Sequence, residues 1–86
     1  MFKVYVLYSP NYHKIYVGYT SDLPNRMDSH NIYSKKGYTT KYRPWEILFT
    51  EDYDTKKEAI IREKQLKSAK GREYIWEEVY KKLNCN

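Results

Sequence analysis

The stretch that decides the fold is FKVYVLYSPNYHKIYVGY, residues 2–19. Residues 2–8 and 14–19 are rich in β-branched and aromatic side chains, which favour strands. Ser9-Pro10-Asn11 follows the first run and has the chemistry of a turn. The stretch therefore predicts two antiparallel strands joined as a hairpin.

Side chains in such a hairpin alternate between the two faces of the sheet. The alternation places Tyr5 on the same face as Lys3 and Leu7, and it places Tyr16 on the same face as Gly18. A glycine inside a strand weakens the strand and is typical of a bulge or of a close approach by another group. We therefore expect a backbone or a ligand to come close to Gly18.

The segment after the hairpin predicts a helix, a loop and a third strand. Side-chain oxygens at residues 20–22 can cap a helix, which is expected from about Asp22 to Asn31. Residues 32–43 are expected to form a loop, because Pro44 disfavours a helix just before it. Residues 45–50, WEILFT, predict the third strand of the same sheet.

The rest of the chain predicts two more helices. One begins at Asp54 or Thr55, with Glu58 as a capping-box partner, and ends near Lys70-Gly71, where glycine suits a left-handed position. The other runs from residue 72 to residue 83, and its expected inner side consists of Ile75, Trp76, Val79, Tyr80 and Leu83.

The order ββαβαα predicts an α+β fold, a small three-stranded and mainly antiparallel sheet flanked by helices. We expect one domain over residues 1–83 and a short C-terminal tail at residues 84–86.

The composition limits the class of protein. With 86 residues there is room for one domain with a thin core, which a weak homodimer could supplement. Cys85 is the only cysteine, so no intramolecular disulfide and no cysteine-based metal site can form. The longest apolar run, Val4 to Tyr8, is far shorter than the roughly 20 residues that span a bilayer. We expect a cytoplasmic protein without a membrane partner.

The net charge of +5 is distributed unevenly. Residues 29–45 contain no acid, and residues 46–53 contain no base. In the first segment basic side chains alternate with tyrosines, which suits a phosphate backbone and unstacked bases. A solvated lysine-rich loop would give the same pattern. The candidates for nucleic-acid binding in this segment are Lys35, Lys36, Lys41, Tyr42 and Arg43.

Glu63 lies on the apolar side of the helix predicted after the third strand. Helical spacing puts Ala59, Ile60 and Leu66 on one face, and Glu63 falls between them. A carboxylate in that position needs a partner, a proton or a metal ion. An inward salt bridge to a lysine or arginine and a bound metal ion are both open explanations.

Few kinds of chemistry are available to the chain. Its three glycines cannot form a Gly-rich phosphate loop, and its two histidines give no zinc-ligand spacing. What remains is the hairpin tyrosines, Glu63, and Arg26 with His30, whose i, i+4 spacing an ordinary surface pair would also explain. This set suits phosphodiester hydrolysis with one divalent ion, since Mg²⁺ keeps most of its waters and often takes one carboxylate.

Five short motifs in order give the chain a family resemblance. They are Val4-Tyr5-Val6, Tyr16-Val17-Gly18, Arg26, His30, and residues 59–66 with Glu63. Together they resemble the GIY-YIG nuclease superfamily, especially small single-domain members related to the N-terminal nuclease domain of UvrC and to URI-type homing endonuclease domains. The resemblance covers nearly the whole chain and implies the GIY-YIG endonuclease fold and a metal-dependent DNA endonuclease.

The resemblance also implies roles for individual residues. Tyr5 and Tyr16 would flank the scissile phosphate, and one of them, Tyr5 by preference, would help to deprotonate the attacking water. Arg26 would stabilise charge on the phosphate, and His30 would position the phosphate or move a proton. Glu63 would be the sole protein ligand of Mg²⁺ or Mn²⁺. Further candidates for contacts with nucleic acid are Tyr19, Lys67 and Lys70.

The chain departs from the family pattern in several places. Lys3-Val4 replaces Gly-Ile in the first motif, and Tyr19 stands where some members have a lysine. An asparagine that several members have beyond the metal glutamate is missing, because that region offers Ile75 and Trp76. These departures keep a second hypothesis open, in which the chain binds nucleic acid without cutting it.

The chain offers no evident reader of base sequence. We therefore expect selectivity for DNA shape, or a protein partner that supplies specificity, in a process such as DNA repair. RNA stays open as a substrate.

Overall fold

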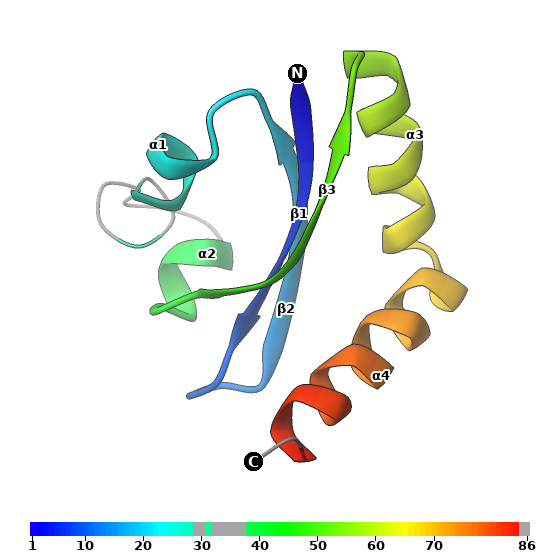
Figure 1. Cartoon of the computed structure of the whole chain (residues 1–86). Coiled ribbons are helices and arrows are strands. Elements are labelled where there is room, and N and C mark those ends of the chain that lie inside the picture. The colour runs from blue at the N-terminus through cyan, green and yellow to red at the C-terminus, as the bar shows by residue number, and fades with distance from the viewer. Residues whose placement is uncertain (29–30, 32–37, 85–86) are drawn as a thin grey trace.

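Three strands form one antiparallel sheet in the structure, a computed structural model that describes residues 1–28, 31 and 38–84 (Figure 1). β1 (Phe2–Ser9) lies in the centre of the sheet. β2 (Lys14–Thr20) pairs with one edge of β1, and β3 (Glu46–Tyr53) pairs with the other. The predicted hairpin and the small antiparallel sheet of an α+β fold are confirmed.

Helices cover both faces of the sheet (Figure 1). α3 (Lys56–Lys67) and α4 (Ala69–Asn84) lie on one face, and α1 (Leu23–Asp28) and α2 (Tyr38–Lys41) lie on the other. None of the helices in the described part of the chain combines the length and the apolar character that crossing a bilayer requires.

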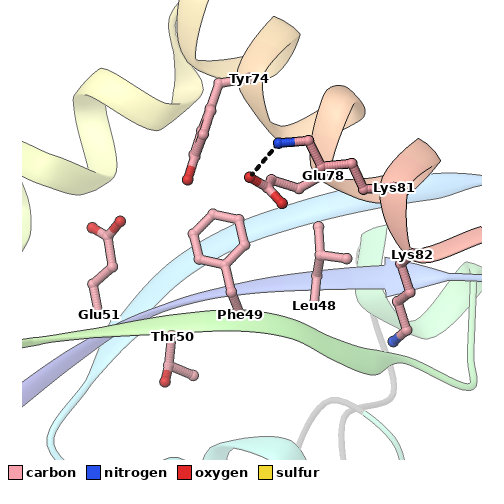
Figure 2. A pocket seen from close by; sticks show the side chains of 8 residues that line it. All are labelled: Leu48, Phe49, Thr50, Glu51, Tyr74, Glu78, Lys81 and Lys82. Atoms are coloured by element: carbon pink, nitrogen blue, oxygen red, sulfur yellow. Dashed lines mark ion pairs between the residues drawn. The ribbon is translucent and has the colours of Figure 1, made fainter. Parts of the chain in front are cut away.

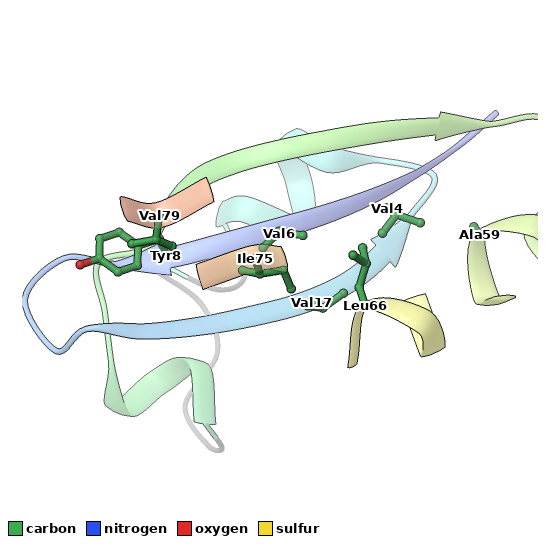
Figure 3. Close-up of a cluster of buried hydrophobic side chains, with 8 residues drawn as sticks. All are labelled: Val4, Val6, Tyr8, Val17, Ala59, Leu66, Ile75 and Val79. Carbon is green, nitrogen blue, oxygen red and sulfur yellow. The ribbon is translucent and has the colours of Figure 1, made fainter. Parts of the chain in front are cut away.

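The alternation of β1 divides the interior into two clusters. Val4, Val6 and Tyr8 face α3 and α4, whereas Tyr5 and Leu7 face the opposite side, as the alternation predicts. The cluster under α3 and α4 is the larger core (Figure 3). Its buried members are Val4, Val6, Tyr8, Val17, Ala59, Leu66, Ile75 and Val79.

The second cluster is built around Trp45, which is buried against Tyr5 and Leu7. The backbone N–H of Trp45 donates to Asn31 Oδ1 at 2.7 Å, and Asn31 Nδ2 donates back to the Trp45 carbonyl at 3.2 Å. The indole N–H donates to the Thr39 carbonyl at 2.8 Å. These bonds satisfy the polar groups around the buried ring and fix the start of β3 against α2.

The beginning of α3 is fixed by a cap. Thr55 is the N-cap, its side-chain oxygen accepts from the backbone N–H of Glu58 at 3.2 Å, and its hydroxyl donates to the Glu58 carboxylate at 2.9 Å. The predicted cap at Thr55 is confirmed.

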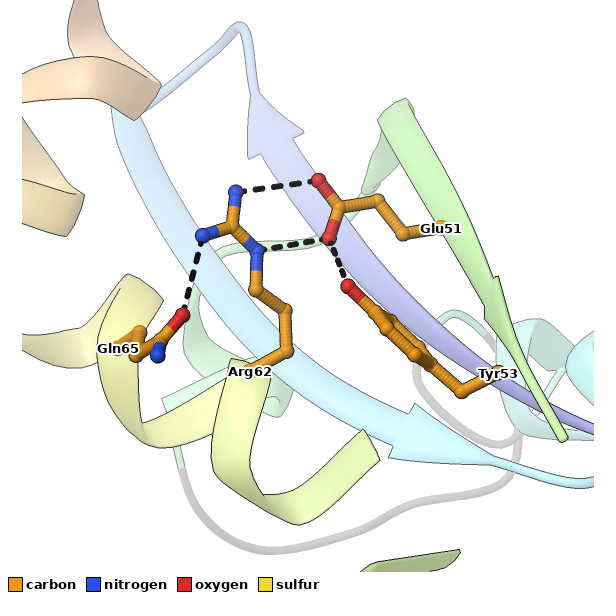
Figure 4. A network of polar contacts seen from close by, with 4 residues as sticks. All are labelled: Glu51, Tyr53, Arg62 and Gln65. Carbon is orange, nitrogen blue, oxygen red and sulfur yellow. Dashed lines mark hydrogen bonds and ion pairs between the residues drawn. The ribbon is translucent and has the colours of Figure 1, made fainter. Parts of the chain in front are cut away.

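The rotation of α3 is fixed by a polar network with β3 (Figure 4). The Glu51 carboxylate accepts two hydrogen bonds from the Arg62 guanidinium, at 2.8 and 3.2 Å, and one from the Tyr53 hydroxyl at 2.9 Å. Arg62 also donates to the side-chain oxygen of Gln65 at 3.3 Å. The bond from Arg62 holds the pKa of Glu51 below its ordinary value. Such paired, charge-assisted bonds are specific in direction, so they orient the helix as well as attach it.

The prediction for the end of this helix is wrong. α3 ends at Lys67 with Ser68 as its C-cap, and Gly71 lies in the first turn of α4. A Cβ built on Gly71 would come within 2.6 Å of the Leu66 carbonyl carbon. Gly71 is therefore needed for the close approach of the two helices and does not occupy the predicted left-handed position.

Other boundaries also differ from the prediction. β3 extends to Tyr53, beyond the expected end at Thr50, and carries an irregularity at Leu48 opposite β1. The expected loop contains α2, and the expected helix over residues 22–31 agrees with α1 up to Asp28, after which residues 29 and 30 lie outside the described part. Tyr80 and Leu83 are about half exposed, so the inner side of α4 is narrower than predicted.

Candidate active site

Tyr5 reaches the candidate site by lying across Gly18 of the neighbouring strand. The two residues are cross-strand partners, and a Cβ built on Gly18 would come within 2.6 Å of the Tyr5 Cζ atom. The Tyr5 ring is almost completely buried, so it has little freedom to move aside. The expected close approach at Gly18 is confirmed, and the approaching group is a phenol, not a backbone or a ligand.

A pocket of about 420 Å³ opens beside this contact, at the edge strand β2. Its walls come from β1, β2, α1, α3 and the residues around them. Four of the five residues that the family resemblance singles out line it, although they come from four different elements. The full lining is Phe2, Tyr5, Tyr16, Gly18, Tyr19, Thr20, Ser21, Arg26, Lys56 and Glu63.

Glu63 points into this pocket from α3. Its side chain is 17% exposed, and its Oε1 atom lies 3.1 Å from the Lys67 ammonium one turn further along the helix. Because Arg62 is held on the β3 side, the next residue is turned by about 100° toward β2. The carboxylate thus faces inward and is paired with a lysine, as the salt-bridge explanation predicts. The bound metal ion stays a prediction.

The two hairpin tyrosines lie together at the pocket. Their ring centroids are 6.3 Å apart, with 33° between the ring planes. Burial raises the pKa of Tyr5 above its ordinary value, the neighbouring Tyr16 and Glu63 raise it further, and Arg26 opposes them. The neutral phenol of Tyr5 is therefore the favoured form, which suits a hydrogen-bond donor better than a base.

Lys56 is a functional candidate that the sequence reasoning missed. It lies in the first turn of α3 and lines the same pocket as Glu63. Lysine at this point brings a second cation into the pocket that Arg26 lines. The available signal was its spacing, because residues seven apart lie on the same side of a helix after two turns.

The remaining predicted residues fall in different places. Tyr19 lines the pocket, and Lys67 pairs with Glu63. Tyr42 packs in the Trp45 cluster, and Lys70 lines a separate hollow beside Arg62. The structure does not bring Lys41 or Arg43 into the pocket. Three predicted residues, His30, Lys35 and Lys36, lie outside the described residues.

The chemistry of the pocket fits a hard divalent cation. Among the described residues, Glu63 is the only one that brings a carboxylate to its lining, beside hydroxyl groups of tyrosine, serine and threonine. Among the described residues there is no group of three or more His, Cys, Asp or Glu side chains that could hold a metal ion. A cation there would have one protein carboxylate and would keep most of its waters, which suits Mg²⁺ or Mn²⁺ and not a closed zinc site.

A different hollow, of about 500 Å³, lies between β3 and α4 (Figure 2). Its two carboxylates are already paired. Glu51 is bonded to Arg62, and Glu78 lies 3.8 Å from the Lys81 ammonium. Its floor is the apolar pair Leu48 and Phe49. This hollow holds one phenol, that of Tyr74, and none of the described residues that the family resemblance singles out lines it.

Comparison with known proteins agrees with this arrangement of residues. A sequence match to the GIY-YIG catalytic domain extends over residues 1–83. A UPF0213 protein of Bacillus velezensis is 39% identical over 70 residues, which cover 78% of this chain and 71% of the relative. The UPF0213 protein YazA of Bacillus subtilis is 42% identical over 65 residues, which cover 72% and 66%.

A UPF0213 protein of Staphylococcus aureus is 37% identical over 54 residues, which cover 63% of this chain and 66% of the relative. No solved structure gives a significant match to the chain. The match over residues 1–83 nevertheless includes every element of the sheet and the whole lining of the pocket at β2. The chain therefore belongs to the GIY-YIG catalytic domain family.

Proposed function

We propose that this chain is a metal-dependent endonuclease that hydrolyses phosphodiester bonds in DNA. The GIY-YIG family is a nuclease superfamily whose members generally depend on divalent metal ions. The observation that carries the proposal is the single pocket that Tyr5, Tyr16, Arg26 and Glu63 line together. Phenols, a guanidinium and a carboxylate from distant parts of the chain have no reason to converge for packing alone.

Each residue has a role that its position suits. The Arg26 guanidinium and the Lys56 ammonium bind the scissile phosphate and stabilise the charge that develops on it. Tyr5 stays protonated and donates a hydrogen bond to a phosphate oxygen, and Tyr16 orients the attacking water. Glu63 holds Mg²⁺ or Mn²⁺, which supplies Lewis-acid activation of the phosphate and of water when it is bound.

Lys67 acts on the site through Glu63. Its ammonium is half exposed and holds the carboxylate from one turn further along the helix. An exposed ion pair of this kind contributes at most about 1 kcal/mol, so it leaves the carboxylate able to exchange its partner.

The same features suggest the setting in which the protein works. Nothing in the pocket lining reads base edges, so we propose selectivity for DNA shape, or a partner protein that directs the enzyme, in DNA repair or processing. We further propose that it acts in the cytoplasm, as a monomer or weak dimer.

The test compares wild-type protein with Glu63→Gln on plasmid, single-stranded and branched DNA, with Mg²⁺, with Mn²⁺ or with EDTA. We expect EDTA to stop cleavage and Glu63→Gln to slow it about 100-fold or more, since a single electrostatic contact at a transition state has an effect of this size. Glu78→Gln is the matched control, because Glu78 lies in the other hollow and should leave the rate unchanged.

Equal cleavage by wild type and Glu63→Gln would contradict the proposal. Salt-dependent binding of DNA by the wild type, with no cleavage under any of these conditions, would instead identify a nucleic-acid-binding module that keeps the fold without the activity.

A further inference from the structure

A second hollow continues the active-site pocket along β2. It has a volume of about 330 Å³ and is lined by Ile15, Tyr16, Val17, Tyr38, Lys67 and Arg72. Tyr16 lines both spaces, and Lys67, which lines the second, is bonded to Glu63 in the first. A strand of DNA that leaves the active-site pocket on this side would enter this space next. We call it the flanking hollow.

The flanking hollow is positively charged. Lys67 is the last residue of α3 and Arg72 lies in the first turn of α4, so the bend between the helices brings the two cations to one wall. None of the residues that the structure describes brings a carboxylate to the lining of the hollow. Among the described residues Arg72 has no ion-pair partner, and Lys67 is paired only with Glu63. Arg72 without an ion-pair partner among the described residues, next to the half-exposed ammonium of Lys67, suits a phosphate group.

Tyrosine rings form the other wall of the hollow and continue beyond it. The rings of Tyr16 and Tyr38 are nearly parallel, with centroids 6.3 Å apart and 26° between the planes, and Tyr38 is 44% exposed. The centroid of the Tyr42 ring lies 4.8 Å from that of Tyr38. The Tyr12 ring, whose residue is 52% exposed, has its centroid 5.5 Å from that of Tyr42. The Lys14 ammonium lies 5.5 Å from the centre of the Tyr42 ring.

Rings of this kind beside cations are a surface on which unpaired bases stack. A base inside a duplex has neighbours on both faces and cannot reach such a surface, whereas the base of a single strand can. The arrangement of Tyr38, Lys67 and Arg72 therefore suits unpaired better than paired DNA.

We propose that the flanking hollow binds the nucleotide next to the scissile phosphate, with a phosphate on Lys67 and Arg72 and an unpaired base on Tyr38. The substrate class is then DNA with a single-stranded segment beside the cut, such as a flap or a frayed end. The position of the cut rests on the proposed endonuclease function, but the binding of unpaired DNA does not require cleavage.

Binding is measured by fluorescence anisotropy in EDTA, so that no DNA is cut. The probes are a fluorescein-labelled duplex and the same duplex with a single-stranded thymidine tail. We expect wild-type protein to bind the tailed DNA about tenfold more tightly than the duplex, because stacking of one or two bases has an effect of this order. Equal binding of the two probes by wild type would overturn the proposal.

Two variants assign the preference to the hollow. Tyr38→Leu should remove the preference for the tail while the affinity for the duplex stays the same. Arg72→Gln should weaken binding of tailed DNA and lower the salt dependence of its affinity by about one phosphate contact. The matched controls are Tyr74→Leu, at 40% exposure in the hollow between β3 and α4, and Lys81→Gln, which makes the same charge change.

Thermal unfolding checks that each variant is folded. If both Tyr38→Leu and Arg72→Gln bind DNA as the control variants do, the proposal is wrong. Cleavage assays then separate the two hypotheses. If wild type cuts DNA and Glu63→Gln does not, but Tyr38→Leu and Arg72→Gln cut tailed DNA at the wild-type rate, the flanking hollow is wrong and the nuclease stands. If the tail preference depends on Tyr38 and no protein cuts, the hollow stands and the nuclease function is wrong.

Discussion

One hydrogen atom at Gly18 decides whether Tyr5 can reach the pocket. Tyr5 starts from the central strand, and its ring extends over the backbone of β2 toward the Glu63 side of the sheet. Sequence alternation predicts the face on which Tyr5 lies, and glycine predicts that something approaches. Neither observation predicts that Tyr5 itself is the group that approaches Gly18, because cross-strand register depends on how the hairpin pairs.

Gly18→Ala should therefore damage activity more than stability. Alanine is the better strand residue by about 0.5–1 kcal/mol, but its Cβ would force the buried Tyr5 ring to move. A displacement of about 1 Å at a reacting group can cost about 100-fold in rate. We expect a loss of this order in cleavage rate, measured with the midpoint of urea unfolding as the stability control.

A double mutant locates the effect of Gly18→Ala. If the effect passes through the Tyr5 hydroxyl, adding Gly18→Ala to Tyr5→Phe should cost much less than the same change in wild type. Fully additive losses would show that Gly18 acts in some other way.

The α3 helix places its carboxylate through a contact made by the residue before it. Arg62 is clamped to Glu51 of β3, and this fixes the rotation that turns Glu63 toward β2. Helical spacing alone predicts that Glu63 is partly inward. It does not predict the clamp, because Glu51 falls in a strand that the sequence pattern ends at Thr50.

The clamp should make stability depend on pH. The pKa of Glu51 is lowered in the folded state, so its contribution is present above the carboxyl pKa of the unfolded chain and is lost as the pH falls through the folded value. At pH 7 we expect Glu51→Gln to reduce the free energy of unfolding by about 1 kcal/mol, since the pair is partly exposed. Urea unfolding at a series of pH values should show the difference from wild type shrinking below about pH 4.

Asp52→Asn is the comparison for Glu51→Gln. Asp52 pairs with Lys3 at 2.6 Å, but both side chains are well exposed, so its removal should change stability by less than about 0.5 kcal/mol at any pH. A loss for Asp52→Asn equal to that for Glu51→Gln would contradict the special role of the clamp.

The molecule keeps its stabilising core on one face of the sheet, whereas its candidate site lies at the β2 edge and takes residues from both faces. Ile75 and Val79 of α4 pack with Val6 and Tyr8 beneath the helices, while Tyr5 belongs to the cluster on the other face. A folded protein has a free energy of unfolding of only about 5–15 kcal/mol. The loss of a few kcal/mol in the core under α3 and α4 is therefore a large part of the total.

Ile75→Ala should remove a large part of that stability. Truncation of a fully buried isoleucine costs about 2–5 kcal/mol, because the apolar atoms are lost and a cavity remains. Ile61→Ala, at a position 49% exposed on α3, should change stability by less than about 0.5 kcal/mol. Equal unfolding midpoints for the two variants would show that α4 does not close the core as described.

The sequence predicts what depends on neighbouring residues. The hairpin, its alternation, the Thr55 cap and the inward side of Glu63 all follow from periodicity or from short-range hydrogen bonding. Lys56 in the pocket, Gly71 between two helices and the narrow inner side of α4 depend on how α3 and α4 meet the sheet. Those positions are set by contacts between residues far apart in the chain, which no local pattern records.

The number of residues in the central strand is fixed by its pairing on both edges. β1 is paired along both edges, and its odd and even residues serve different layers. Deleting one residue would send Tyr5 among the valines under α4 and a valine to the side of the candidate site, an inversion that no shift of β2 alone could repair. The turn after Ser9 lies outside this pairing, so an added residue there should be tolerated better than one inserted within β1.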